Sequence, residues 1–289
     1  MWRRIGWCSV PFDLNLIEIG GVVMNDENLQ EELRKLKEHF KNKLGYELNL
    51  EFPHTLQEKI QWIKIYGKLE RFAKYTDKFE VYSFIKERIG TKYLIPLLGV
   101  YDDVDDIDFE ALPTSFVMKA THGSRWNIIV EDKSKIDWNA SKEQMRTWLN
   151  SSWYQISKER NYKDLQSRVI IQPHLKVLYG KFKEYQFHCF HGIPKFFRIT
   201  GIGNYDMKGN PLFGSPYYPL INKPRRFDEM KSIVYKLCKD FAYVRVDLFY
   251  TVQGIYFCEL TFAHGGGFLP TPKDFGSRIG QWLDLTRYL

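Results

Sequence analysis

The sequence predicts an α+β fold, because its strand patterns come in consecutive pairs and its helix patterns stand before and between those pairs. Hydrophobic residues make up 44% of the 289 residues and aromatic residues 16%, so the chain is globular and long enough for one large or two modest domains. The strand pairs are residues 115–121 with 126–131, residues 183–190 with 195–200, and residues 243–262, which hold two strand patterns about the turn Val252-Gln253-Gly254.

The charge balance predicts an acidic partner. The net charge is +7 and the isoelectric point is about 9.0, which suits a nucleotide, an anionic polymer or an anionic membrane surface. The basic residues are scattered without a dense Lys/Arg run, so we do not expect nucleic acid as the partner. The four cysteines are widely spaced and form no CxxC motif, which favours reduced thiols in a cytosolic protein over a zinc site.

The chain contains no apolar run long enough to span a bilayer. We therefore expect no transmembrane segment and a cytoplasmic location, with peripheral association at the inner face of the cell membrane left open. Residues 1–24 faintly imitate a signal peptide, but Asp13 and Glu18 interrupt the apolar part and no cleavage site stands out. We expect residues 1–24 to be an upstream extension without stable structure, with Met24 as an alternative start.

Residues 25–75 read as an N-terminal helical region. Asn25 or Asp26 can cap a first helix, and a second helix follows Pro53. The next helix is expected to open with a capping box at Asp77–Glu80 and to end near Gly90. Lys78 would then sit in the first turn, where a cation opposes the helix dipole and is favoured by a nearby anion. A solvated lysine is the alternative.

Further charged and loop residues mark candidate ligand contacts. Lys119 lies within the otherwise apolar strand 115–121, and an unpaired buried ammonium is costly. The loop that follows it contains Gly123 and Ser124, whose backbone N–H groups could cover phosphates. In the irregular segment 201–226, Arg225 and Arg226 could receive an acidic substrate, although solvation is the alternative.

The last strand pair carries the most specific chemistry. Its register predicts Asp247 opposite Glu259, Arg245 opposite Thr261 and Tyr250 opposite Tyr256, with Gly254 in the left-handed region. Two like charges in this position destabilise a sheet, so they call for a compensating cation such as Mg²⁺. Arg245 would offer a second positive group to a phosphate held by that metal. The alternative is a solvated face on which Arg245 offsets the two carboxylates.

Taken in order, these features resemble the TupA-like (teichuronopeptide biosynthesis) ATP-grasp family. The resemblance covers about residues 55–285. It is carried by the segments QEKIQWIKIYGKL, YTDKFEVYSFIKERIG, YLIPLLGVYD, LPTSFVMKATHGS, NIIVEDKSKI, EYQFHCFHGIPKF and YVRVDLFYTVQGIYFCELTF.

The resemblance implies two α+β lobes with mainly antiparallel sheets that clasp ATP. The first lobe, residues 76–175, would hold the phosphate loop, and the second, residues 176–289, would hold the metal-binding hairpin. ATP and Mg²⁺ are the implied cofactors, with the roles distributed as follows: Lys78 and Lys119 on the phosphates, Gly123 and Ser124 over the triphosphate, Gln172 to Leu175 near adenine, Glu184 near the ribose, Asp247 and Glu259 on Mg²⁺, and Arg245 on the transferring phosphoryl group.

The implied activity is that of an ATP-dependent carboxylate–amine ligase that works through an acyl-phosphate. We expect it to act with an amine co-substrate on a uronic-acid-containing surface polysaccharide, such as a capsule, or on its precursor. A glycan kinase and a glycosyltransferase are the other enzyme hypotheses. Arg125, Trp126 and Thr261 depart from the residues usual in the family or in many ATP-grasp enzymes, and motivate a fourth hypothesis, a nucleotide-binding subunit without catalysis.

The general base is left open among three residues, His122, His264 and Glu184. For His122 a structural place in the loop is the favoured interpretation. His264, with Arg225 and Arg226, is also a candidate for substrate contact. It opens the sequence His264-Gly265-Gly266-Gly267, in which glycines allow a backbone to approach a ligand closely.

Overall fold

A computed structural model of the chain describes residues 18–19, 22–23, 26–212, 219 and 221–288. The chain forms two compact units, residues 1–48 and 49–289, and each is described by itself. In the first unit, β1 (Glu18–Ile19) pairs antiparallel with β2 (Val22–Val23), and α1 spans Asp26–Leu44. Met24 and the predicted cap Asn25 lie outside the described residues, as does most of the expected extension.

The second unit contains a four-stranded antiparallel sheet in the order β3-β6-β4-β5. Its strands are β3 (Gly99–Tyr101), β4 (Phe116–Ala120), β5 (Asn127–Val130) and β6 (Val169–Pro173). One face packs on α5 (Trp138–Leu149), where Phe116, Met118, Met145 and Trp148 are buried in one cluster. Because alternate residues of β4 point the other way, Lys119 lies on the half-buried face rather than in the core.

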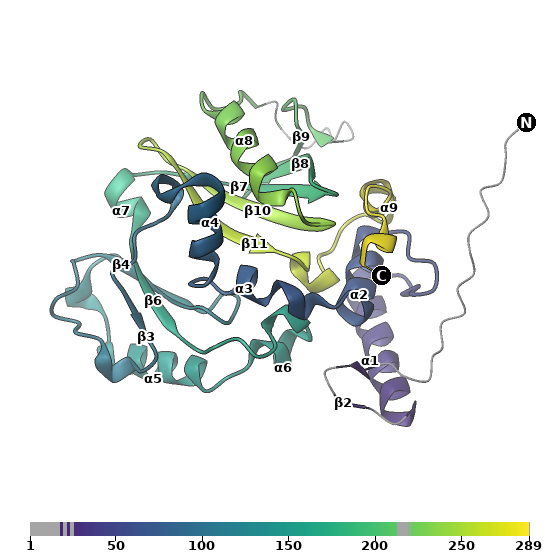
Figure 1. The fold of residues 1–289 in the computed structure, drawn as a ribbon, viewed down its shortest axis with the longest axis horizontal. Helices are drawn as coiled ribbons and strands as arrows, with labels where there is room; N and C mark the ends of the chain where they lie inside the picture. The colour runs from purple at the N-terminus through teal and green to yellow at the C-terminus, as the bar shows by residue number, and fades with distance from the viewer. Residues whose placement is uncertain (1–17, 20–21, 24–25, 213–218, 220, 289) are drawn as a thin grey trace, which may run out of the picture. The chain divides into compact units, whose positions relative to one another are not determined.

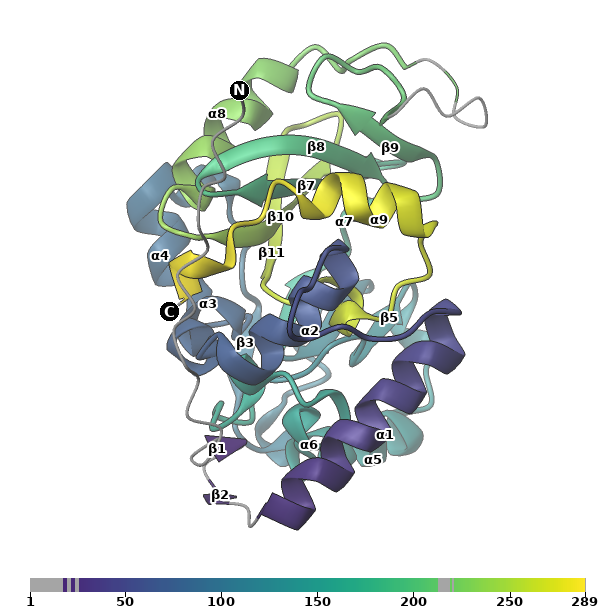
Figure 2. The same cartoon turned by 90° about the vertical axis from the view of Figure 1, so that its right-hand side faces the viewer.

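A five-stranded antiparallel sheet follows, in the order β11-β10-β7-β8-β9. Its strands are β7 (Lys183–Phe190), β8 (Ile193–Ile199), β9 (Gly203–Asp206), β10 (Tyr243–Tyr250) and β11 (Ile255–Thr261). Helix α8 (Phe227–Cys238) covers its apolar face, with the Phe227 ring 5.1 Å from that of Phe197. In both views, α8 lies on one side of the five-stranded sheet and the four-stranded sheet lies on the other side (Figures 1 and 2).

The remaining helices of this unit are short, and one links its beginning to its end. Helix α2 begins after Thr55, which forms a capping box with Glu58. Lys59 of α2 donates hydrogen bonds to the carbonyls of Gly280 and Leu283, 2.9 and 2.6 Å away, which holds α2 against α9. The helices are α2 (Leu56–Tyr66), α3 (Ala73–Thr76), α4 (Val81–Ile89), α6 (Trp153–Ser157), α7 (Leu175–Tyr179) and α9 (Lys273–Gly280).

The structure corrects the predicted hairpin in one part. Asp247 pairs with Glu259 and Arg245 with Thr261, as predicted, but Tyr250 lies opposite Ile255 and not opposite Tyr256. The cause is a β-bulge at Cys258, which inserts one extra residue into β11 and shifts the register beyond it. Gly254 is not among the residues with a positive φ, so the predicted left-handed glycine is wrong as well.

Three element boundaries also differ from the prediction. Helix α4 begins at Val81, so Lys78 lies in the turn before the helix; Asp77 does accept from the Phe79 and Glu80 amides, both at 2.8 Å. The apolar run Leu94–Tyr101 predicts a strand over its whole length, but β3 begins only at Gly99, since Pro96 in the first half of the run has no N–H for the ladder. At the C-terminus, the pattern of Gln281–Tyr288 predicts a short helix, but the structure has a 3-10 turn over Leu285–Tyr288, and the unpredicted helix α9 lies before this range and ends at Gly280.

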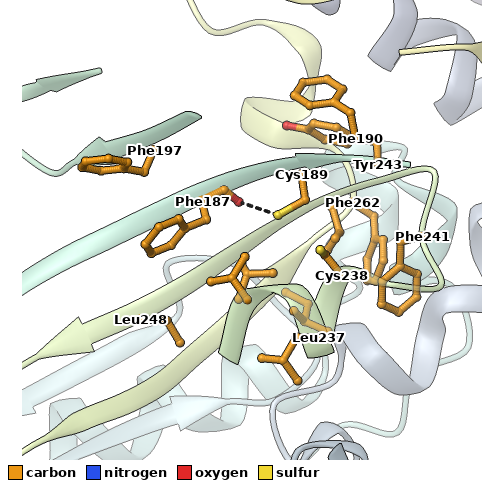
Figure 3. Packing of buried hydrophobic residues seen from close by; sticks show 14 of the residues in the cluster. Phe187, Cys189, Phe190, Phe197, Leu237, Cys238, Phe241, Tyr243, Leu248 and Phe262 are labelled. Carbon is orange, nitrogen blue, oxygen red and sulfur yellow. Dashed lines mark hydrogen bonds between the residues drawn. The ribbon is translucent and has the colours of Figure 1, made fainter. Parts of the chain in front are cut away.

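Phe262, the residue after β11, joins the five-stranded sheet to the helices around it. Its side chain is 1% exposed, and its ring stacks on that of Phe72 at 4.6 Å. It also contacts the Phe241 ring edge-on at 5.1 Å (Figure 3). We expect Phe262→Ala to lower the free energy of unfolding by about 3–5 kcal/mol, since the truncated ring leaves a cavity. Urea denaturation measures this, with Val252→Ala as the control because Val252 is 79% exposed. Equal midpoints for the two variants would contradict the packing role.

Candidate nucleotide and metal site

One face of the five-stranded sheet carries a row of polar side chains. Period-two alternation puts Arg245 and Asp247 of β10 on the face opposite Val244 and Val246, which are buried beneath α8. The strand register then places further polar residues on the same face, beside these two: Glu184, Gln186 and His188 of β7, Arg198 of β8, and Glu259 and Thr261 of β11.

Arg245 bridges the two opposed carboxylates. Its Nε donates to Asp247 Oδ1 at 2.7 Å, and its Nη2 donates to Glu259 Oε1 at 2.7 Å. Asp247 has no exposed surface, whereas the Glu259 side chain is 38% exposed. The sheet therefore supplies its own compensating cation, and Glu259 is the carboxylate that remains open to a ligand.

His264 holds Arg245 from the other side. Its Nδ1 lies 2.6 Å from Arg245 Nη1, and because a guanidinium can only donate, Nδ1 must accept. The imidazole is then neutral, with its proton on Nε2. Burial and the Arg245 charge lower the pKa of His264 well below its usual value, which agrees with that tautomer. His264 thus orients Arg245, and the ring of His188 packs edge-on against it at 4.7 Å.

The pKa values of Asp247 and Glu259 are shifted in opposite directions by their surroundings. Burial raises the pKa of Asp247 to about 7, although Arg245 opposes the shift. Burial also acts to raise the pKa of Glu259, but Arg245, Lys78 and Lys119 outweigh it, and the net pKa is lowered. Glu259 is therefore anionic at neutral pH and lies within the electrostatic reach of two lysines from the other lobe.

Those lysines are the two that the sequence analysis singled out. Lys78 Nζ donates to the Gly123 carbonyl, and the Lys78 backbone amide donates to the Thr121 carbonyl at 3.2 Å, which ties the turn before α4 to the end of β4. Burial lowers the pKa of Lys78; Glu259 opposes the shift and Lys119 adds to it. The structure therefore brings Lys78, Lys119, Asp247 and Glu259 together.

The loop after β4 is anchored by an aromatic side chain. Trp126 folds back over Gly123, and a Cβ at Gly123 would lie 2.2 Å from the indole. The Trp126 ring also stacks on Trp148 at 6.5 Å, so this departure from the family pattern packs the loop in place. His122 Nε2 donates to the Trp148 carbonyl at 2.8 Å, which supports the structural interpretation of this histidine. Ser124, the next residue of this loop after Gly123, is half-buried.

Gln172 and its neighbours lie at the exit of β6, where the resemblance places adenine. Gln172 Nε2 donates to the Tyr82 hydroxyl at 2.6 Å, while its buried Oε1 has no hydrogen-bond partner. The Nδ1 of buried His174 is unpartnered too, and Leu175 is buried at the start of α7. An unpaired buried acceptor is costly, so these atoms fit a ligand that donates hydrogen bonds, such as an adenine amino group.

The donor set also fits Mg²⁺ bound together with phosphate. Among the residues that the structure describes, no group of three or more His, Cys, Asp or Glu side chains could hold a metal ion. Asp247 and Glu259 are two carboxylates opposite each other on neighbouring strands. Mg²⁺ is commonly bound through one or two carboxylates plus substrate phosphates and water, so this pair suits it.

Three predicted residues lie apart from this cluster or make other contacts. Glu184, on the polar face, accepts a hydrogen bond from Thr200 Oγ1 at 2.7 Å. Arg226 forms a bidentate ion pair with Glu229 at 2.6 and 2.8 Å next to the start of α8, on the apolar side of the sheet, and Arg225 is exposed beside it. The structure does not bring Arg225 and Arg226 to the lysines and carboxylates.

Sequence reasoning missed two buried charges next to the site. Lys64 of α2 donates to the Gly266 carbonyl at 3.1 Å, and Glu159 precedes the 3-10 turn Arg160–Tyr162. A Cβ at Gly266 would lie 3.6 Å from Glu159 Oε1 and 4.0 Å from Lys64 Nζ. The signal available in the sequence was the Gly265-Gly266-Gly267 run, since a glycine is required wherever side chains approach a backbone so closely.

Two facing antiparallel sheets, one supplying lysines and a phosphate-loop candidate and the other a carboxylate pair, define the ATP-grasp class of fold. The chain belongs to the TupA-like ATP-grasp family, whose family model matches residues 58–283. None of the curated protein sequences compared with the chain matches it. The site roles carried over from the family stay predictions.

Solved structures are similar at a distance. They include D-alanine–D-alanine ligase from Helicobacter pylori (15% identity over 73% of this chain and 61% of that chain, TM-score 0.41). The same enzyme from Bacillus anthracis has 17% identity over 68% of this chain and 64% of that chain, with a TM-score of 0.41. The ATP-grasp ligase PsnB, complexed with precursor peptide PsnA2 and AMPPNP, has 12% identity over 91% of this chain and 73% of that chain, with a TM-score of 0.45. The chain thus spans less than two thirds of the length of either D-alanine–D-alanine ligase.

As for membranes, none of the helices in the described ranges has the length and apolar character needed to cross a bilayer.

Lys64 and Glu159 should give the protein a stability minimum near pH 7–8. Burial raises the pKa of Glu159 from 4.5 to about 7, so the folded state binds more protons and stability falls as pH rises through that window. Burial lowers the pKa of Lys64 from 10.5 to about 8, so stability rises again as pH increases through that window. At about 1.4 kcal/mol per unit, each limb amounts to at most about 3 kcal/mol.

Urea denaturation between pH 4.5 and 10 measures both limbs. We expect Glu159→Gln to flatten the acidic limb and Lys64→Met the alkaline limb, while Glu80→Gln, which loses a partly buried ion pair with Arg168, leaves the shape of both limbs unchanged. Profiles that run parallel for wild type and Glu159→Gln would show that Glu159 titrates normally.

Proposed function

We propose that the protein is an ATP-dependent carboxylate–amine ligase that acts, through an acyl-phosphate, on a uronic-acid-containing surface polysaccharide or its precursor. The observation that carries the proposal is the convergence of Lys78 and Lys119 from one lobe with Arg245, Asp247 and Glu259 from the other. Membership of the ATP-grasp family supports the ATP-dependent part. The net charge of +7 supports an acidic glycan as the carboxylate substrate.

Each of these residues has a definable task. Lys78 and Lys119 would bind the phosphates, since Lys78 is held at the Gly123 carbonyl and the loop over residues 122–126 is fixed by Trp126. Asp247 and Glu259 would hold Mg²⁺, and Gln172 Oε1 would accept from adenine. When bound, Mg·ATP supplies an electrophilic phosphoryl group whose negative charge is offset by the metal and nearby cations.

Arg245 is the residue whose hydrogen-bond partners would change when Mg·ATP binds. Without a bound cation its guanidinium is shared between Asp247 and Glu259, at 2.7 Å from each. A metal on the same carboxylates would compete for their lone pairs, which leaves Arg245 free to bind a phosphoryl oxygen. His264, which accepts from Arg245 Nη1, would keep the guanidinium aimed at that position. His264 is therefore proposed to act through Arg245 rather than as the general base.

We propose a cytoplasmic protein that meets its glycan at the inner face of the membrane, with Arg225 as an exposed contact for an acidic chain. The competing enzyme hypotheses differ in product. A glycan kinase would stop at a phosphorylated sugar, and a glycosyltransferase would bind a sugar nucleotide in place of ATP.

Binding of Mg·ATP is the first test. We expect Mg·ATP to raise the melting temperature of the wild type, since a ligand that binds only the native state stabilises it. Lys119→Ala should weaken ATP binding at least about tenfold, through loss of a phosphate contact. Asp247→Asn should remove the dependence of binding on Mg²⁺. Lys231→Ala on α8 and Asp105→Asn, both in ion pairs at the surface, are the controls. ATP binding that is equal in wild type and Lys119→Ala would sink the site assignment.

Product formation then separates the activities. We expect ADP release to require both a uronic acid and an amine, and to fall at least about a hundredfold in Arg245→Met while ATP still binds, because the charge on the transferring group is left uncompensated. Mass spectrometry of the product identifies an amide or a phosphorylated sugar. Turnover that does not respond to any amine rules out the ligase, and binding of Mg·ATP without turnover on any acceptor favours a nucleotide-binding subunit.

A further inference from the structure

Two buried opposite charges lie beside the carboxylate pair without contacting each other. Lys64 is 6% exposed and Glu159 is 8% exposed, and they come from segments 95 residues apart in the chain, α2 and the turn after α6. Each affects the pKa of the other, but no hydrogen bond or ion pair joins them. If the two groups served only to neutralise each other, we would expect a direct ion pair, because the electrostatic attraction between two charges falls as they move apart.

Glu159 has an unused carboxylate. Its backbone is engaged, since its amide donates to Ser157 Oγ at 3.1 Å and its carbonyl accepts from the Tyr162 amide at 3.0 Å. In the described part of the chain, however, no hydrogen bond or ion pair reaches its carboxylate oxygens. A buried carboxylate that lacks both is costly, so its place in the fold indicates a cationic partner that binds from outside.

Lys64 has donor capacity to spare. Its ammonium donates to the Gly266 carbonyl at 3.1 Å and lies 5.0 Å from the centre of the Phe268 ring. Gln61, one turn earlier on α2, donates to the same carbonyl at 2.9 Å and fixes the loop. An ammonium carries three donors, and this one uses a single carbonyl. The remaining donors suit an anion.

Gly266 is the common neighbour of both charges. Its φ is +60°, and a Cβ placed there would be in van der Waals contact with both Glu159 Oε1, at 3.6 Å, and Lys64 Nζ, at 4.0 Å, so both charged groups face the same glycine. The same loop begins with His264, which is hydrogen-bonded to Arg245, so the two charges lie next to the candidate site for phosphoryl transfer. The charges of Glu259 and Arg245 both act on Glu159 and on Tyr162, in agreement with that proximity.

We propose that Lys64 and Glu159 form the subsite for the second substrate, and that this substrate is a zwitterion, a free amino acid. Its carboxylate would bind the Lys64 ammonium and its ammonium would bind the Glu159 carboxylate, so that one ligand satisfies both charges. An amine without a carboxylate would leave Lys64 without an anion. The inference rests on the proposed ligase function, because it names the amine of that reaction and gives it a place next to Arg245.

The test measures recognition of each charge separately. The full-length protein, with Mg²⁺ and a non-hydrolysable ATP analogue, is titrated with the standard amino acids in both enantiomers, and binding is followed by saturation-transfer NMR and calorimetry. For an amino acid that binds, the methyl ester lacks the carboxylate charge and the N-acetyl derivative lacks the ammonium charge. We expect each derivative to bind the wild type at least about tenfold more weakly than the parent.

Each variant should erase one of these two preferences. Lys64→Met should bind the amino acid and its methyl ester about equally, and Glu159→Gln should bind the amino acid and its N-acetyl derivative about equally. Two controls should keep both preferences. Lys59→Met also loses contacts from α2 to backbone carbonyls, but on the side of Gly280 and Leu283, and Glu80→Gln loses the ion pair with Arg168. A merely structural role would weaken every ligand alike and leave the preferences in place.

The outcomes separate this inference from the proposed function. If no amino acid binds the wild type, or if both variants keep both preferences, the proposed subsite is wrong. The proposed ATP site is still supported in that case if Mg·ATP raises the melting temperature. If amino acids bind as expected but Mg·ATP gives no thermal shift, the subsite stands and the ligase proposal fails.

Discussion

The site depends on one ion-pair network, the Arg245 guanidinium shared between Asp247 and Glu259. Two carboxylates on neighbouring strands repel, and a sheet that places them opposite each other needs a cation between them. Arg245 provides it at 2.7 Å from each acid, from two residues along the same strand as Asp247. Loss of one member of such a buried network leaves the others uncompensated, which couples the stability of the strand pair to the chemistry it carries.

The same constraint explains why the two lobes have opposite charge at their meeting point. Lys78 and Lys119 belong to segments around the four-stranded sheet, while the acids belong to the five-stranded sheet, and both lysines act to lower the pKa of Glu259. Burial lowers the pKa of Lys78, so a second anion would be stabilised there as well. The polyanionic nucleotide that we propose as the ligand would offset the positive charge of these two lysines.

The sequence was sufficient for the features that rest on local periodicity, and less so for those that rest on tertiary contacts. Alternation predicted the strand pairs and put Asp247 and Glu259 on one face, because alternate residues of a strand point to the same side. The predicted turn supplied their pairing, which the structure confirms although the register closer to the turn is shifted. It did not predict the bulge at Cys258, since an extra residue in β11 follows from packing that no local pattern encodes. Lys64 and Glu159 come close to each other beside Gly266. They belong to segments far apart in the chain, so a local pattern with a period of two or 3.6 residues cannot predict that they are neighbours. Helix α9 was missed because Gly276 and Gly280 are poor helix formers, kept there by close approach to Gln57 and His54.

The contact between α2 and α9 has a further consequence for how far this fold can be trimmed. Lys59 ties the first helix of the 49–289 unit to its last turn, and Lys64 on the same helix reaches the Gly266 carbonyl. A fragment restricted to the two sheets would therefore lose both the contact between α2 and α9 and the hydrogen bond from Lys64 to the Gly266 carbonyl. Helix α2 is in this sense part of the structure that supports the candidate site, and we expect a fragment that folds by itself to begin before Thr55, its N-cap residue.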